Sequence, residues 1–215
     1  PFGIDTESFK NAMNTRSVLK QRDELKDSLA GKRVILGVDR LDFIKGIPNK
    51  LLAFEHLLEE RPEWRGKVVL IQVATPSRTQ SEEYQSFRSD VLEMVGRING
   101  RFGTLEDIPI HYRELALNFE ELCALYAVAD IAVLTSLRDG MNLVSYEYVM
   151  CQTEHHGALV LSEFTGAAQN LPGALRCNPW NIEQVSSAIH EALEMSDLER
   201  AMNHEKMYRY VMLNT

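Results

Sequence analysis

The stretch Asp130-Ile-Ala-Val-Leu-Thr-Ser-Leu-Arg-Asp-Gly-Met-Asn-Leu-Val-Ser-Tyr-Glu147 changes character within a few residues. It opens with a continuous apolar run, which is typical of a fully buried strand, and then passes through Arg138-Asp-Gly140 into residues at helical spacing. A strand that ends in a turn and a helix explains this shape, with Gly140 as a permissive backbone position and Asn142 helping to cap the helix. The shape alone does not explain the charges of Arg138 and Asp139.

The same pattern of a strand followed by a helix recurs along the chain. Apolar runs predict six buried strands, at residues 33–38, 67–73, 108–112, 131–135, 158–161 and 174–177. Between them, apolar residues at helical spacing predict helices at 47–60, 81–97, 119–128, 141–152 and 182–195. This alternation implies right-handed crossovers and a parallel sheet covered on both faces. Without an internal repeat or a low-complexity linker, we expect residues 1–215 to form one doubly wound, Rossmann-like α/β domain.

Composition narrows the class of protein. A chain of 215 residues with 45% hydrophobic content can bury a substantial core. Its net charge of -8 argues against a general nucleic-acid-binding surface, although a local basic cleft for a small anion remains possible. Cys123, Cys151 and Cys177 lie in or beside apolar segments without a CxxC pattern, which predicts buried reduced thiols. No apolar run approaches the roughly 20 residues of a membrane span, so we expect a cytoplasmic enzyme or binding domain with no membrane partner.

Both ends of the sequence look cut. Pro1-Phe-Gly-Ile-Asp5 is typical of a turn that leads out of an earlier segment. The last residues, 208–215, stop within a helical pattern and show no Gly or Pro stop signal. We therefore expect a piece of a larger protein.

Charged loops follow three of the predicted strands, at residues 39–46, 75–78 and 138–140. Open parallel sheets bind ligands beyond the carboxyl ends of their strands, so these loops are expected to meet at one edge. The first loop has no GxGxxG pattern, which argues against a nicotinamide or flavin dinucleotide.

In the first of these loops, Arg40 offers a planar fork and Lys45 a compact charge, a combination suited to a diphosphate. The alternative is a surface ion-pair cluster with Asp39 and Asp42, and the charge pattern alone leaves both interpretations open.

The third loop leads into the start of a helix, where the first backbone N–H groups lack intrahelical acceptors and favour an anion. Leu143 and Val144 can contribute their amides whatever their side chains. Glu147, about one turn into the helix, can accept hydrogen bonds from ribose hydroxyls, or it is simply an exposed helical glutamate.

Asp139 would repel a diphosphate, so its expected partner is a neutral hydroxyl, as on a sugar attached to that diphosphate. Pairing with Arg138 in the turn is the alternative. Arg78 brings a further cation to the same edge and is a candidate for a second anion, such as a phosphorylated acceptor.

Other polar segments suggest no site. Residues 97–103 look like a glycine-punctuated loop, but Gly100 is interpreted as the end of the preceding helix. The histidines, including His155 and His156, have no metal-ligand spacing. No Ser/His/Asp arrangement is identifiable.

Four ordered motifs together resemble the trehalose-6-phosphate synthases: Asp39-Arg-Leu-Asp-Phe-Ile-Lys-Gly46, Gly96-Arg-Ile-Asn-Gly-Arg-Phe-Gly103, Arg138-Asp-Gly-Met-Asn-Leu-Val-Ser-Tyr-Glu147 and Leu161-Ser-Glu-Phe-Thr-Gly-Ala-Ala168. The resemblance runs from about residue 1 past residue 181. It implies the C-terminal, donor-binding half of a GT-B glycosyltransferase.

The resemblance also implies a reaction. Glucose passes from UDP-glucose to glucose 6-phosphate, giving trehalose 6-phosphate and UDP with retention at the anomeric carbon. The leaving diphosphate assists deprotonation of the acceptor, so stabilising charge on its oxygens is the main task, and neither a metal nor a cofactor is required.

By motif position, the resemblance implies a role for each candidate residue. Arg40 and Lys45 are expected to bind the diphosphate, and the amides of Leu143 and Val144 to cap it. Asp139 is expected to hold hydroxyls of the donor glucose and Glu147 the ribose, with Gly140, Met141 and Asn142 forming the turn that contacts the donor. Arg78 is expected to bind the acceptor phosphate. Arg40, Lys45 and Asp139 would be catalytic.

One departure limits this expectation. In such enzymes the acceptor pocket, with a histidine near the reacting centre, lies mostly in an N-terminal domain, and a closing C-terminal helix returns to that domain. We expect both to be absent from this sequence. We expect weak binding of UDP or UDP-glucose, little synthase activity by the chain alone, and self-association through an exposed apolar strip. Two alternatives remain: a domain from a catalytically silent regulatory synthase-like protein, or another GT-B transferase such as a sucrose-phosphate or glycogen synthase relative.

Overall fold

The computed structural model describes residues 3–77 and 81–214 and contains one sheet of six parallel strands. The strands are β1 (Arg33–Arg40), β2 (Val68–Thr75), β3 (Ile110–Arg113), β4 (Ile131–Leu134), β5 (Ala158–Ser162) and β6 (Leu175–Cys177). Their order is β3-β2-β1-β4-β5-β6, so the direction of winding reverses between β1 and β4. Ligands of doubly wound sheets bind at such a switch point. The expected α/β architecture is confirmed.

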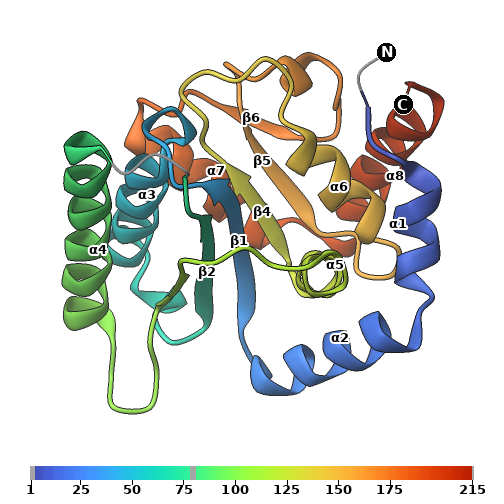
Figure 1. The fold of residues 1–215 in the computed structure, drawn as a ribbon. Helices are drawn as coiled ribbons and strands as arrows, with labels where there is room; N and C mark the ends of the chain where they lie inside the picture. The colour runs from blue at the N-terminus through green and yellow to red at the C-terminus, as the bar shows by residue number, and fades with distance from the viewer. Residues whose placement is uncertain (1–2, 78–80, 215) are drawn as a thin grey trace.

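Helices cover both faces of the sheet (Figure 1). One face carries α3 (Ile47–Glu60), α4 (Glu82–Phe102) and α7 (Ile182–Glu194), and the other carries α5 (Phe119–Val128), α6 (Leu143–Cys151), α1 (Thr6–Met13), α2 (Arg16–Ser28) and α8 (Asp197–Asn214). In the described part of the chain, three short 3-10 turns lie in the connections: η1 (Phe43–Lys45), η2 (Pro62–Trp64) and η3 (Gly166–Gln169).

Each layer of helices encloses its own apolar core. Neighbouring residues of a strand point to opposite faces, so Ile35 packs into one core and Leu36 into the other. This two-sided burial explains the apolar runs of β1, β2, β4 and β5. Cys123, Cys151 and Cys177 are buried and unpaired, as expected.

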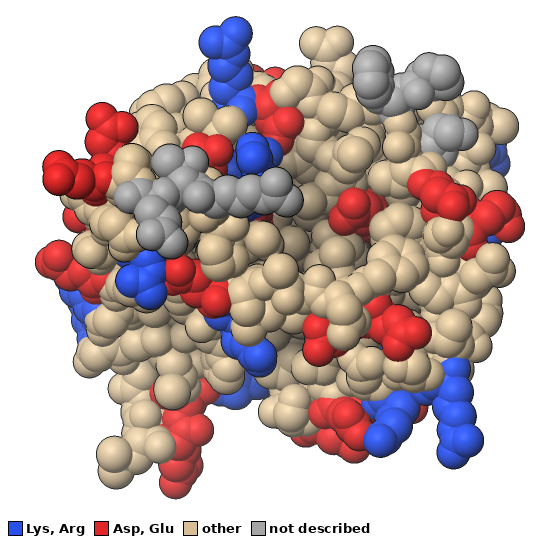
Figure 2. All heavy atoms as spheres, viewed as in Figure 1, with Lys and Arg blue, Asp and Glu red and all other residues tan. Residues whose placement is uncertain are grey.

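Acidic and basic side chains are interspersed on the face shown in Figure 2.

The structure departs from the sequence expectations at three helices, α4, α1 and α2. Gly100 lies inside α4, which continues to Phe102, so the prediction that Gly100 ends this helix is wrong. Contacts from the last turn outweigh the glycine: Asn99 exchanges two hydrogen bonds with the backbone of Ile110, and Arg101 pairs with Glu59. Residues 6–28, to which the pattern assigned no element, form α1 and α2. Within the described residues, none of the helices is apolar and long enough to cross a membrane.

Candidate functional site

The loops that follow β1 and β4 are joined into one unit at the switch point. Thr135 Oγ1 donates to the carbonyl of Gly46 at 2.8 Å, and the Leu137 amide donates to the carbonyl of Ile44 at 2.7 Å. Gly46 has a φ of 64°, and a Cβ there would overlap the Thr135 carbonyl, so both the conformation and the close approach require glycine. The expected convergence of the loops at 39–46 and 138–140 is therefore confirmed.

Lys45 and Asp139 meet across these two loops. Lys45 Nζ lies 2.6 Å from Asp139 Oδ2, and the two side chains are only 16% and 15% exposed. Burial alone would raise the pKa of Asp139, but the hydrogen bond and charge of Lys45, with the Met141 amide and the Asn142 side chain, hold that pKa below its ordinary value. The partner of Asp139 is thus Lys45, while Arg138 is exposed.

Arg40 lies at the same strand end with a largely free guanidinium. It is the last residue of β1, its side chain is 63% exposed, and its Nη2 lies 3.6 Å from Asp42 Oδ2. The alternative of a surface ion pair is therefore correct for Arg40 and Asp42, although the contact is long and exposed. An exposed pair at this distance contributes little, so it does not prevent Arg40 from binding an anion.

The start of α6 lies directly after Asp139. Asn142 caps this helix, because its side chain accepts from the Ser145 amide at 3.1 Å. The left-handed residue of the turn is Asn142, with a φ of 67°, and Gly140, expected as a permissive backbone position, has no positive φ. Asn tolerates this conformation better than most residues. Leu143 and Val144 come next, and their N–H groups have no acceptor within the helix.

The loop after β5 holds this turn in place. The Asp139 amide donates to Phe164 O at 3.2 Å, the Gly166 amide donates to Asp139 O at 3.0 Å, and the Ala167 amide donates to Met141 O at 3.0 Å. A Cβ on Gly166 would overlap the Gly140 carbonyl. The sequence patterns did not assign this supporting role to residues 163–167, and the only local signal for it is the glycine.

Glu147 points toward α5 and is not an exposed helical glutamate. Its Oε2 accepts from the hydroxyl of Tyr126 at 2.9 Å, and Tyr126 is fully buried. Burial raises the pKa of Glu147, and the hydrogen bond from Tyr126 opposes that rise only in part. Sequence reasoning missed Tyr126, because it stands in an apolar helix and its spacing does not distinguish it from a core residue.

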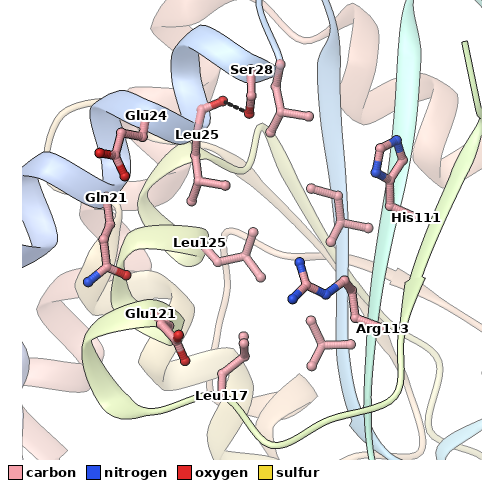
Figure 3. Close-up of a pocket in the computed structure, with 12 residues that line it drawn as sticks. Gln21, Glu24, Leu25, Ser28, His111, Arg113, Leu117, Glu121 and Leu125 are labelled. Atoms are coloured by element: carbon pink, nitrogen blue, oxygen red, sulfur yellow. Dashed lines mark hydrogen bonds between the residues drawn. The ribbon is translucent and has the colours of Figure 1, made fainter. Parts of the chain in front are cut away.

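A separate cavity of about 480 Å³ lies between α2, α5 and strands β2 and β3. Figure 3 shows Arg113 and Glu121 on its walls, over an apolar floor that includes Leu125. Its lining includes none of Arg40, Lys45, Asp139 and Glu147. Arg78, the remaining candidate, lies outside the described residues.

The geometry at the switch point can be compared with known proteins, and residues 1–215 match the family model of glycosyltransferase family 20. The chain belongs to glycosyltransferase family 20. This family 20 chain is 56% identical over 211 residues to the 56 kDa subunit of the UDP-forming alpha,alpha-trehalose-phosphate synthase of Saccharomyces cerevisiae. The match covers 98% of the chain and 43% of that relative.

Two solved structures share the fold of the family 20 chain. A UDP-forming alpha,alpha-trehalose-phosphate synthase from Burkholderia xenovorans, in complex with glucose-6-phosphate, is 38% identical with a TM-score of 0.94. An E. coli structure bound with UDP-2-fluoro glucose is 37% identical, also with a TM-score of 0.94. Both matches cover 100% of this chain, against 47% and 48% of the solved chains. The chain therefore spans less than half the length of these relatives, and its sheet is one half of a GT-B fold.

Proposed function

We propose that the chain is the donor-binding half of a retaining glucosyltransferase and binds UDP-glucose or UDP. In a protein that also carries an acceptor domain, glucose would pass to glucose 6-phosphate, giving trehalose 6-phosphate. The observation that carries this proposal is the contact between Lys45 and Asp139 at the switch point, directly before the free amides of α6. Cations and amides suit the phosphates of a sugar nucleotide, and a carboxylate suits its hydroxyls.

The relatives supply the identity of the substrates. The yeast relative is named a UDP-forming synthase, one solved relative holds UDP-2-fluoro glucose, and another holds glucose-6-phosphate. Fold alone would not justify this step, because one fold hosts many functions. The step depends on the charged groups at the carboxyl edge of the sheet.

In this proposal, Arg40 and Lys45 bind the diphosphate and the amides of Leu143 and Val144 cap it. Asp139 holds hydroxyls of the donor glucose. Glu147 holds the ribose, and Tyr126 fixes the direction of its carboxylate through the hydrogen bond at 2.9 Å. The role of Arg78 at the acceptor phosphate stays a prediction from the motif.

These groups act on the leaving diphosphate. As the bond to the anomeric carbon breaks, negative charge builds up on the diphosphate oxygens, which help to take the proton from the acceptor hydroxyl. Fixed cations and helix amides stabilise that charge without reorganising during the reaction. The chain spans less than half the length of these relatives, so we expect it to bind the donor weakly and to transfer little glucose by itself.

Titration calorimetry of the chain with UDP tests the proposal. We expect measurable binding that weakens as salt is raised and is lost in an Arg40→Ala/Lys45→Ala variant. A Lys20→Ala/Lys26→Ala variant removes the same charge from α2, at the other end of the sheet (Figure 1), and should bind like the wild type. Equal affinity of the two double variants would reject the diphosphate assignment.

Transfer itself is tested in a protein extended to the length of the relatives. UDP release from UDP-glucose in the presence of glucose 6-phosphate would identify an active synthase. Binding of UDP without any release would instead identify a catalytically silent relative.

A further inference from the structure

A fully buried ion pair lies directly behind the candidate site. Lys50 Nζ is 2.6 Å from Asp39 Oδ2, and the two side chains are 0% and 1% exposed. Gln72 completes the cluster, because its Oε1 accepts from Lys50 at 3.0 Å and its Nε2 donates to Asp39 at 3.0 Å. These three side chains join β1, β2 and α3.

The cluster closes the base of the loop that carries the candidate cations. Asp39 immediately precedes Arg40, and Lys50 lies in the first turn of α3, five positions after Lys45. The Lys50 amide also donates to the carbonyl of Gly46, which ends the loop, at 3.1 Å. The contact between Asp39 and Lys50 therefore ties together the two ends of the segment that contains Arg40 and Lys45.

The strand next to this cluster is adapted to it. Gly37 shares the face of β1 with Asp39, and a Cβ at Gly37 would overlap both Gln72 Oε1 and Lys50 Nζ. A side chain is thus missing from the middle of a central strand, which weakens strand packing. A buried ion pair is in general no more stabilising than well-packed apolar residues of similar volume. Stability alone is a poor explanation for this cluster.

Hydrogen bonds fix the relative orientation of the groups that they join more strictly than apolar contacts do. Apolar side chains can slide past one another, whereas the hydrogen bonds among Lys50, Asp39 and Gln72 require one geometry. We propose that Lys50 is a positioning residue, which acts through Asp39 to hold the 40–46 loop in its phosphate-binding conformation. This inference rests on the proposed function of the site, and it adds a residue that does not itself touch the nucleotide.

The test compares three variants of the chain by titration with UDP. Lys50→Met removes the contact and should lower UDP affinity by about tenfold, since small displacements of binding groups are costly. Asp39→Asn removes the counter-charge of Lys50 and should lower the stability of the chain. It keeps an oxygen that accepts from Lys50, so the UDP affinity of the folded variant should stay within about threefold of wild type. The Asp39→Asn/Lys50→Met variant leaves no unpaired buried charge but still lacks the contact, so it should remain weakened by about fivefold or more.

Two controls separate positioning from a general loss of structure. Uridine, which has no phosphate, should bind all folded variants equally in ligand-observed NMR. Arg97→Met breaks the pair with Glu55, also on α3 but away from the loop, and should bind UDP like the wild type. Wild-type affinity in Lys50→Met would overturn the inference. Should Lys50→Met fail to fold, wild-type affinity in the double variant would overturn it equally.

Failure of the proposed function and failure of the positioning role of Lys50 give different results in these titrations. A wild-type chain that does not bind UDP would reject the proposed function itself. UDP binding that depends on Arg40 and Lys45 but is unaffected by loss of the Lys50 contact would reject only the positioning role.

Discussion

Replacement of Lys45 by Met and of Asp139 by Asn, singly and together, measures how strongly the loops after β1 and β4 are coupled. The two groups lie 2.6 Å apart and are 16% and 15% exposed. A hydrogen bond between charged groups contributes about 1.5–3 kcal/mol, and residual contact with water reduces this, so we expect a coupling energy of about 1–2 kcal/mol. For a chain of this size, the melting temperature of Lys45→Met should fall by roughly 2–8 °C.

The coupling should disappear in acid. In the folded chain the pKa of Asp139 lies below its ordinary value of 3.8, because Lys45 outweighs the effect of burial. The stabilisation is therefore complete above pH 3.8 and is lost as the pH falls through the lower folded pKa. Urea unfolding of the four proteins at pH 7 and again below pH 3.8 tests both statements. Additive effects at pH 7, with a coupling under about 0.5 kcal/mol, would refute the pair.

Two further predictions concern buried titratable groups. Burial raises the pKa of Glu147 above its ordinary value, so its ionised form costs stability once the pH exceeds the folded pKa. Glu147→Gln should therefore raise the free energy of unfolding in urea at pH 7, yet it should weaken UDP binding. A loss of stability or an unchanged UDP affinity would count against this assignment. Burial lowers the pKa of His204, which hydrogen-bonds to the Val149 carbonyl and stacks on His156, so the stability of the chain should fall as the pH drops below 6.5 toward the folded pKa. In thermal melts, His204→Asn should flatten the dependence of the melting temperature on pH between about pH 5 and 7. An unchanged pH dependence would exclude His204 as its source.

The strands were predictable because burial on both faces requires a run of apolar residues that is visible in the local sequence. Residues of β4 face a core on both sides, so Ile131–Leu134 is apolar without interruption. The apolar pattern in α2 is weak, since Val18 is its only fully buried residue, Leu19 and Leu25 are partly buried, and its other residues are polar. Its position depends on packing against α5, which periodicity within α2 does not encode.

The meeting of the loops after β1 and β4 was also predictable, because the carboxyl edge of a parallel sheet brings separate loops together. The choice of partners within the site was not. Lys45 has Asp42 nearby in the sequence, and Asp139 has Arg138 beside it, yet Lys45 and Asp139 pair across 94 positions. Local charge patterns favour neighbours, whereas the hydrogen bonds that join the loops decide the pairing.

This pairing has a consequence for ligand selection under the proposed function. The charge of Lys45 is balanced by Asp139, so a simple anion gains less from Lys45 than an unpaired lysine would offer. A sugar nucleotide differs because it brings phosphates for Lys45 and hydroxyls for Asp139 together, so neither group is left buried without a partner. A cation paired with a carboxylate therefore favours the complete donor over phosphate alone, which a cluster of cations would not do.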